Sequence, residues 1–223
     1  GIIHSKANTE LFDLATTFKI PVVTTLMGRG AFPDGNELCL EMPGMHGNYT
    51  ATTSIQNADL LIAIGVRFDD RVTANPSFFA QNAKVIHADI DPAEIGKVRD
   101  SEVPIVGDAK SVIKGLMESL GDTNLDTEGW ISELKDMKSK FPLSYKQEDK
   151  GPLKVPYVLE ELQKLTKEEA IVVSGVGQHQ MWISQHWNFT EPNTWLNSGG
   201  LGTMGYALPV SYTHLTLPTS YAV

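Results

Sequence analysis

Hydrophobic positions along the first 120 residues follow two spacings, which predict alternating helices and strands. Helices are predicted at 9–18, where apolar residues recur at helical spacing, at 49–57 and at 109–120, and residues 92–96 start a helical turn. Asp91 and Asp108 stand where the segments 92–96 and 109–120 would be capped. Short, almost wholly apolar runs predict buried strands at 20–25, 59–66, 83–89 and 103–106. Strands alternating with helices of this length indicate a parallel sheet covered on both faces.

The pattern changes after residue 120 and then resumes. Residues 121–152 are polar and turn-rich, with one charged amphipathic helix at 130–141, and we interpret them as a linker. Beyond it, the pattern predicts a helix at 155–165, a strand at 170–174 and a turn at 175–177. We therefore predict an α/β protein. A Rossmann-like, parallel-sheet central domain (1–120) precedes the start of a second α/β domain (153–209).

Composition excludes several classes of protein. The 223 residues carry a net charge of -9 without a basic run, which gives no electrostatic reason to bind nucleic acid or anionic lipid. A single cysteine, Cys39, excludes an internal disulfide and a multi-cysteine zinc site. No apolar run approaches the ~20 residues that cross a bilayer. The composition, 41% hydrophobic and 20% charged, is that of an ordinary globular protein.

Polar or glycine-containing turns follow all four predicted strands of the first unit. These turns are 26–30, 67–71, 89–91 and 107–109. Ligands of open parallel sheets bind beyond the carboxyl ends of the strands. Arginines pair with phosphates, carboxylates with ribose hydroxyls, and glycines let the backbone approach a pyrophosphate. The turns together therefore indicate a dinucleotide site of the FAD or NAD type.

Two alternatives stay open for these residues. Arg67, Asp69, Asp70 and Arg71 could form surface ion pairs, each contributing less than about 1 kcal/mol. The glycine fingerprint of Rossmann nucleotide sites is absent, so the prediction depends on the recurrence of the turns. His46 lies between glycines in a loop, where it suits either a structural role or contact with a flat ring or phosphate.

The second unit carries a different kind of turn. Gly175 and Gly177 open a helix whose free amides suit a phosphate, and Gln178 and His179 add neutral donors. The alternative is a simple strand-to-helix turn with a buried histidine. The glycine-rich stretch 199–205 suits a backbone pressed against a ligand, with Met204 as an apolar wedge. We expect a diphosphate site here.

Seven motifs carry a resemblance to a known family. In the first unit they are TTLMGRGAFP (24–33), PGMHG (43–47), LLIAIGVRFDDRVT (60–73), HADIDPAEIGK (87–97) and VPIVGDA (103–109). In the second unit they are GVGQHQMW (175–182) and WLNSGGLGTMGYALP (195–209). Together they resemble the central and diphosphate-binding domains of acetolactate (acetohydroxyacid) synthase catalytic subunits, which are thiamine-diphosphate-dependent enzymes. The resemblance covers about residues 1–209.

The resemblance implies cofactor contacts at particular positions. FAD, held as a structural cofactor, would contact Thr25, Leu26, Met27, His46, Gly65, Arg67, Arg71, Val72, Asp89, Ile90 and Asp108. Thiamine diphosphate would contact Val176, Gly177, Gln178, His179, Gly202 and Met204. Mg²⁺ is the third cofactor, but its binding segment and the activating glutamate are expected outside this chain. No residue here is therefore assigned as catalytic or as a metal ligand.

The implied activity is acetolactate synthesis in branched-chain amino-acid biosynthesis. The enzyme would decarboxylate pyruvate and transfer the two-carbon unit to pyruvate or 2-ketobutyrate. The resemblance also implies a homodimer or homotetramer, a regulatory subunit, and a location in bacterial cytoplasm, plastid or mitochondrion. The central domain would lack its first strand, with Gly1 a remnant of a glycine triplet, and we expect this piece alone to be inactive.

Rival functions remain. Another thiamine-dependent enzyme, a glyoxylate carboligase or a pyruvate oxidase, would share this architecture. A non-catalytic flavin- or nucleotide-binding module would need the central domain alone, and the second glycine-rich turn argues against it.

The C-terminal stretch 210–223 has neither helical period nor kinship with the family. We interpret it as a non-native tail, translated from a sequencing adapter, and assign no function to His214.

Overall fold

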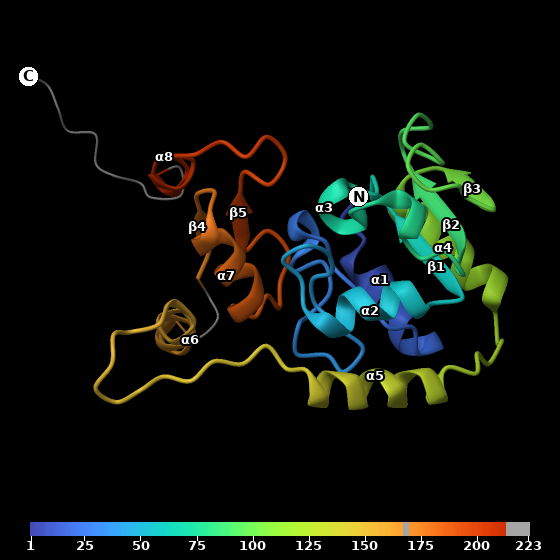
Figure 1. Ribbon diagram of the computed structural model, residues 1–223. Helices are drawn as coiled ribbons and strands as arrows, with labels where there is room; N and C mark the ends of the chain where they lie inside the picture. The colour runs from blue at the N-terminus through green and yellow to red at the C-terminus, as the bar shows by residue number, and fades with distance from the viewer. Residues whose placement is uncertain (167–169, 213–223) are drawn as a thin grey trace, which may run out of the picture.

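The computed structural model describes residues 1–166 and 170–212, which form two α/β units (Figure 1). The first unit contains a parallel sheet of β1 (Leu60–Ile64), β2 (Lys84–Asp89) and β3 (Val103–Val106), in that order. In register, Leu60 pairs with Lys84, and Asp89 pairs with Val106. All three strands run in the predicted segments, and the predicted parallel α/β class is confirmed.

Helices cover both faces of this sheet. On one face, α1 (Asn8–Phe18) and α4 (Ala109–Leu120) bury Phe18 and Ile113 against Ile64. On the other, α2 (Tyr49–Asn57) packs with the buried side chains of β1 and β2. Successive strand residues point to opposite faces, so nearly continuous apolar runs suit strands covered on both sides.

Short helices follow the strands and loops of the same unit. They are η1 (Leu26–Gly28), α3 (Asp70–Thr73) and η2 (Pro76–Phe78). The side chain of Asp69 accepts the Arg71 amide at the start of α3, and Asn75 likewise accepts from Ser77 at η2. Asp108 caps α4 as predicted, accepting from Lys110 and Ser111. These caps fix where each turn leaves the sheet.

One predicted element, the strand at 20–25, is wrong. Residues 20–25 make a single isolated bridge, Val22 to Cys39, outside the three-stranded sheet. Backbone hydrogen bonds join Val22 to Leu38 and Leu40, and Thr24 to the Glu41 carbonyl. The pairing extends no further into a strand, since Pro21 has no N–H to donate and Glu41 has a left-handed φ of 65°.

Residues 92–96 form turns that Asp91 starts, as predicted: its side chain accepts the Ala93 amide at 2.9 Å, and its carbonyl accepts the Glu94 amide at 3.1 Å. Gly96, with a φ of 74°, ends this segment before a longer helix forms.

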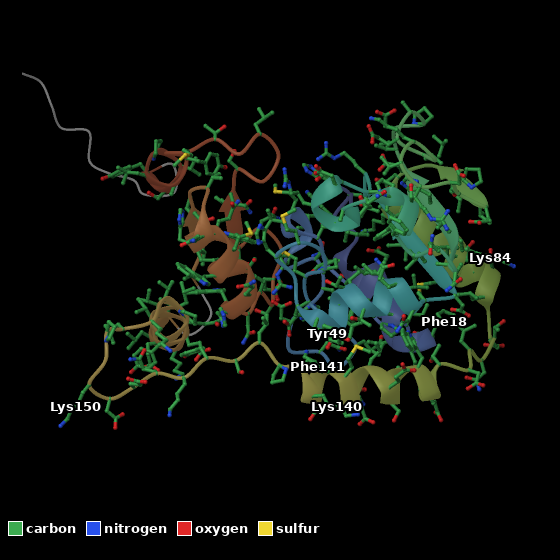
Figure 2. All side chains as sticks on the ribbon, viewed as in Figure 1. Phe18, Tyr49, Lys84, Lys140, Phe141 and Lys150 are labelled. Carbon is green, nitrogen blue, oxygen red and sulfur yellow. The ribbon has the colours of Figure 1, made fainter. Side chains whose placement is uncertain are left out.

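The linker is partly docked on the first unit. Its helix α5 (Glu128–Lys140) runs beneath α2 and buries Leu134 against Leu40 and Ala51 (Figure 1). Just after this helix, the Phe141 ring lies 4.4 Å from that of Tyr49, centroid to centroid (Figure 2). Only the later part of the linker is therefore free to span the two units.

The second unit is smaller. It consists of α6 (Val155–Thr166), β4 (Val172–Ser174), α7 (Gln178–His186), β5 (Trp195–Asn197) and α8 (Ala207–Tyr212). β4 and β5 are parallel, and β5 is a strand that the sequence pattern did not predict. Its core stacks Phe189 on Trp195, with ring centroids 5.1 Å apart.

Helix α8 crosses the predicted tail boundary between residues 209 and 210. The remainder of that predicted tail, 213–223 with His214, lies outside the described residues, so the tail stays a prediction. Within the described ranges, no helix is both long and apolar enough to span a membrane.

A buried ion pair joins the two units. Arg29 donates to both carboxylate oxygens of Asp34, at 2.7 and 2.6 Å, with side chains 2% and 1% exposed. The same carboxylate accepts the backbone N–H of Phe189 at 2.7 Å, and the Asp34 amide donates to the Phe189 carbonyl. The Arg29 guanidinium also lies 5.5 Å from the centre of the Phe189 ring.

This environment affects two titrating groups. Burial raises the pKa of the Asp34 carboxyl, and the Arg29 charge opposes that rise. Burial also raises the pKa of the neighbouring Cys39 thiol to about 12, with the Asp34 charge adding to it. The thiol is therefore un-ionised and unreactive near neutral pH.

We expect Arg29→Met to lower the free energy of unfolding by about 3–5 kcal/mol, because it leaves the Asp34 carboxylate buried without its counter-charge. Arg29→Met/Asp34→Asn should recover part of the loss, since a neutral amide oxygen still accepts the Phe189 N–H. Urea denaturation measures both. As the control, Lys97→Met breaks an exposed pair with Glu94 and should cost less than about 1 kcal/mol. Equal losses for Arg29→Met and Lys97→Met would contradict the assignment.

Candidate functional site

The carboxyl ends of β1, β2 and β3 form one continuous edge. The Gly65 amide donates to the Ala88 carbonyl at 2.7 Å, and the Gly107 amide donates to the Asp89 carbonyl at 2.9 Å. The terminal amine of Gly1 donates to the Gly65 carbonyl at 3.3 Å. The structure thus brings together three of the four predicted turns, and it adds the chain start to them.

Glycine is required at the centre of this edge. Gly65 has a φ of 63°, and a Cβ there would collide with Cα of Gly1. The two backbones touch directly, which leaves peptide groups rather than side chains on the surface. Such a bare backbone suits close approach by a pyrophosphate.

The charged residues around the edge are largely exposed. Arg67 pairs with Asp69 at 3.1 Å, and Arg71 with Asp70 at 3.6 Å. The surface ion pairs that the alternative interpretation predicted are therefore present. Exposed pairs of this kind contribute little to stability, so their arginines can bind a ligand instead. The pKa of Asp69 is lowered, first by the Arg71 backbone amide that it accepts.

Further predicted residues sit beyond Asp89. Ile90 is 73% exposed, which is unusual for an isoleucine at a sheet edge, and Asp89 accepts the Asp91 amide through its side chain at 2.9 Å. The Asp108 carboxylate is exposed at the start of α4, where its capping bonds use only Oδ1. An exposed apolar side chain beside free carboxylate oxygens leaves room for a ligand with a ring and hydroxyl groups.

The loop that carries His46 docks on the arginine loop. The Met45 amide donates to the Arg71 carbonyl at 2.8 Å, and Arg71 Nη1 lies 3.8 Å from the Met45 sulfur. A Cβ at Gly44 would meet Cα of Val72 at 2.9 Å, so glycine allows the close fit. His46 and Met45 are both exposed. The structure thus groups His46 with Arg71 and Val72.

Thr25, Leu26 and Met27 lie elsewhere than predicted. They do not follow a strand of the sheet, and Leu26 packs into the core of the second unit. A Cβ at Gly199 would meet the Met27 sulfur and Leu26 Cδ2. Leu26 and Met27 therefore face the glycine-rich loop of the second unit. The segment does not follow a strand of the three-stranded sheet, and its contact with FAD stays a prediction.

The second candidate site follows β4 and β5, whose carboxyl ends lie together. Gly177 has a φ of 145° and precedes α7, which begins at Gln178. The Gln180 and Met181 amides bond back to the Gly177 carbonyl. The amides of Gln178 and His179 stand ahead of the first helical bond, as an anion-binding helix start requires.

Side chains complete this turn. Val176 is half-buried, whereas Gln178 and His179 are exposed, so the buried-histidine alternative does not hold. The His179 ring folds over the turn, 3.2 Å from where a Cβ of Gly175 would stand. Gln180 Nε2 donates to Asn197 Oδ1 at 3.1 Å and ties the turn to β5.

The glycine-rich loop starts where β5 ends. Ser198 holds it: its carbonyl accepts the Gly202 amide at 3.0 Å, and its hydroxyl accepts the Thr203 amide at 2.9 Å. Met204 is 79% exposed beyond this turn. Gly202 and Met204 thus lie in the loop that follows the carboxyl end of β5, next to β4, whose end carries the turn before α7.

Sequence reasoning missed three contributors. Met45 and Ser198 stood inside the motifs, but only their flanking residues were selected. Gln185 of α7 donates to the His46 carbonyl at 2.8 Å, a contact that no local pattern signals. Among the described residues, no group of three or more His, Cys, Asp or Glu side chains could hold a metal ion.

Comparison with known proteins agrees with this geometry. Residues 1–116 match the family described as thiamine pyrophosphate enzyme, central domain. Residues 175–214 match the thiamine pyrophosphate enzyme, C-terminal TPP binding domain. The first match spans the first unit. The second match begins after β4 and spans α7, β5 and α8, so α6 and β4 lie with the linker between the two matches.

Individual relatives are also similar. The chain is 52% identical over 215 residues to an acetolactate synthase of Mycobacterium leprae, covering 95% of this chain and 34% of that protein. It is 51% identical over 214 residues to the acetolactate synthase large subunit of Corynebacterium glutamicum, covering 95% and 34%. A chloroplastic acetolactate synthase 1 of Oryza sativa is 48% identical over 198 residues, covering 86% and 30%. The chain spans about a third of the length of these curated relatives.

We expect Gly65→Ala to lower the free energy of unfolding by about 1–3 kcal/mol, since the new methyl group meets both a left-handed φ and the Gly1 backbone. Gly115→Ala is the matched control: it lies within α4, and nothing stands within 4 Å of the new Cβ. That substitution should stabilise by about 0.5–1 kcal/mol. Thermal unfolding of the two variants measures the contrast, and a harmless Gly65→Ala would refute the close backbone contact.

Proposed function

Because the chain belongs to the thiamine pyrophosphate enzymes, we propose that it is the middle third of an acetolactate synthase catalytic subunit. The whole enzyme would decarboxylate pyruvate and transfer the two-carbon unit to pyruvate or 2-ketobutyrate in branched-chain amino-acid biosynthesis. The observation that carries the proposal is identity of about half the residues to acetolactate synthases across both matched domains.

We propose that FAD binds at the edge of the three-stranded sheet. The direct contact of Gly65 with Gly1 provides a bare backbone for the pyrophosphate. Arg67 and Arg71 supply exposed cations, and Asp89 and Asp108 supply carboxylates for ribose hydroxyls. Ile90, His46 and Val72 would line the isoalloxazine or adenine rings. In this proposal the flavin is structural, since the net reaction transfers no electrons.

The segment Thr25–Met27 has a different place in this proposal. Its contacts lie with the glycine-rich loop, so it would line the flavin on the side that faces the second unit. We infer that the two cofactors would be held within a short distance of each other, one on either side of Met27.

We propose that the diphosphate of thiamine diphosphate binds at the start of α7. The TPP-binding domain match spans this region. The free amides of Gln178 and His179, beside Val176 and Gly177, suit a diphosphate. Gly202 would let the backbone approach the cofactor closely, and the Met204 side chain would support the bent form of the cofactor. When bound, the thiazolium supplies an electron sink for decarboxylation.

The remaining parts of the enzyme would come from outside this chain. The described residues hold no ligand set for Mg²⁺, so we propose that its ligands, and the glutamate that activates the cofactor, belong to other segments of the protein. The relative from Corynebacterium is named a large subunit, and by analogy we propose a regulatory partner and a homodimer or homotetramer. The location would be bacterial cytoplasm, plastid or mitochondrion.

Glyoxylate carboligase and pyruvate oxidase are the alternatives within the family. In an oxidase, the flavin is reduced during turnover with pyruvate. We expect no bleaching of the flavin absorbance in this enzyme.

We expect Arg67→Ala to raise the dissociation constant for FAD roughly tenfold or more, because the substitution removes one charge-assisted hydrogen bond to the cofactor. Quenching of flavin fluorescence by the 223-residue chain measures it. The control is Lys84→Ala, at the opposite end of β2 from Asp89 (Figure 2). If both variants bind FAD alike, the site lies elsewhere.

A chimera tests the activity. Residues 1–209 would replace the matching third of the Corynebacterium large subunit. We expect acetolactate formation from pyruvate with thiamine diphosphate and Mg²⁺. In the chimera, Met204→Ala should lower kcat roughly tenfold or more. Leu165→Ala, at a residue 78% exposed on α6, should leave kcat unchanged. A folded chimera without acetolactate formation would overturn the proposal.

A further inference from the structure

His87 is completely buried beneath the loops of the candidate flavin edge, with 0% of its surface exposed. It lies on β2 two residues before Asp89, so both side chains leave the same face of the sheet. His87 is not among the residues assigned to cofactor contacts. A buried imidazole needs partners for both ring nitrogens, and these partners identify its role.

Each ring nitrogen of His87 contacts a different loop. Nε2 lies 2.9 Å from the Val66 carbonyl oxygen, and the Gly96 amide donates to Nδ1 at 3.4 Å. A backbone amide can only donate, so Nδ1 carries no proton. The proton therefore resides on Nε2, which donates to Val66. These two hydrogen bonds fix the ring in one tautomer.

The two partners lie on the loops that carry the proposed ligand contacts. Val66 directly precedes Arg67. Gly96 ends the turn that begins after Ile90, and the Asp91 side chain holds that turn by accepting the Ala93 amide at 2.9 Å. The imidazole thus spans the loop after β1 and the loop after β2.

A third contact of His87 fixes the shape of the loop after β1. Phe68 has a φ of 52°, which is unfavourable for a residue with a side chain. Its ring meets the His87 imidazole edge-on at 5.0 Å and the Phe79 ring at 5.9 Å, measured between centroids. Burial against these two rings holds the left-handed turn between Arg67 and Asp69.

We propose that His87 is a positioning residue of the flavin site, which sets the loop of Arg67 and the turn after Asp89 at a fixed separation before the ligand arrives. The proposal rests on FAD binding at this edge. A site whose groups are already placed loses less conformational entropy on binding, so its affinity is higher. His87 would act through the two loops without touching the cofactor.

Three variants separate the contacts. His87→Leu removes both hydrogen bonds. His87→Gln places an amide N–H near the position of Nε2 and retains the Val66 bond, whereas His87→Asn retains an acceptor for Gly96. The matched control is Val85→Ala, which removes core volume from the same face of β2 and leaves both loop bonds in place.

Hydrogen–deuterium exchange of the cofactor-free 223-residue chain gives the first readout. We expect His87→Leu to accelerate exchange at Gly96 and within 67–73 together. His87→Gln should affect mainly Gly96, and His87→Asn mainly 67–73. Val85→Ala should accelerate neither selectively. Unchanged exchange at both loops in a folded His87→Leu chain would overturn the positioning role.

FAD titration gives the second readout. The dissociation constant should rise roughly tenfold in His87→Leu, less in His87→Gln and His87→Asn, and stay near the wild-type value in Val85→Ala. Equal weakening by Val85→Ala would reduce the role of His87 to stability and overturn the proposal. If the wild-type chain itself takes no FAD, the flavin proposal fails, and the exchange pattern still decides whether His87 holds the two loops.

Discussion

The bidentate contact between Arg29 and Asp34 is the constraint on which the arrangement of the two units depends. Both side chains are all but inaccessible to water, and the carboxylate also accepts a backbone N–H from the second unit. A charge taken out of water at such cost is tolerated only when every lone pair finds a donor. The pair therefore favours the placement of the units in which the Phe189 N–H reaches the Asp34 carboxylate.

That placement brings the two candidate sites together. Met27 of the first unit touches the glycine-rich loop at Gly199, and Gln185 of α7 holds the carbonyl of His46. Each candidate site is thus contacted by residues of the other unit. A change in the docking of the units would alter both sites at once, even where no ligand-contacting residue is replaced.

Local pattern was sufficient for most of the fold and for much of each site. Apolar runs predicted β1, β2 and β3, and Asp108 predicted the start of α4, because strand burial and helix capping act within a few residues. The segment 20–25 was mispredicted because its β-branched composition says nothing about how far a partner segment pairs with it, and here the pairing amounts to a single bridge. β5 was missed because three residues beside a glycine-rich loop carry no period. The contacts of Gln185 and His87 depend on residues far apart in sequence, and tertiary packing alone creates them.

The docking of α5 has a consequence for the motion of the molecule. Since Phe141 rests on Tyr49, the connection between the units is only the short stretch up to α6. A chain of that length keeps its ends within roughly 20 Å, and tethers of this kind hold their partners at millimolar effective concentration. If the interface around Arg29 opens, the linker still holds the two units close to each other. Reclosure is then a unimolecular event whose rate does not depend on how dilute the protein is.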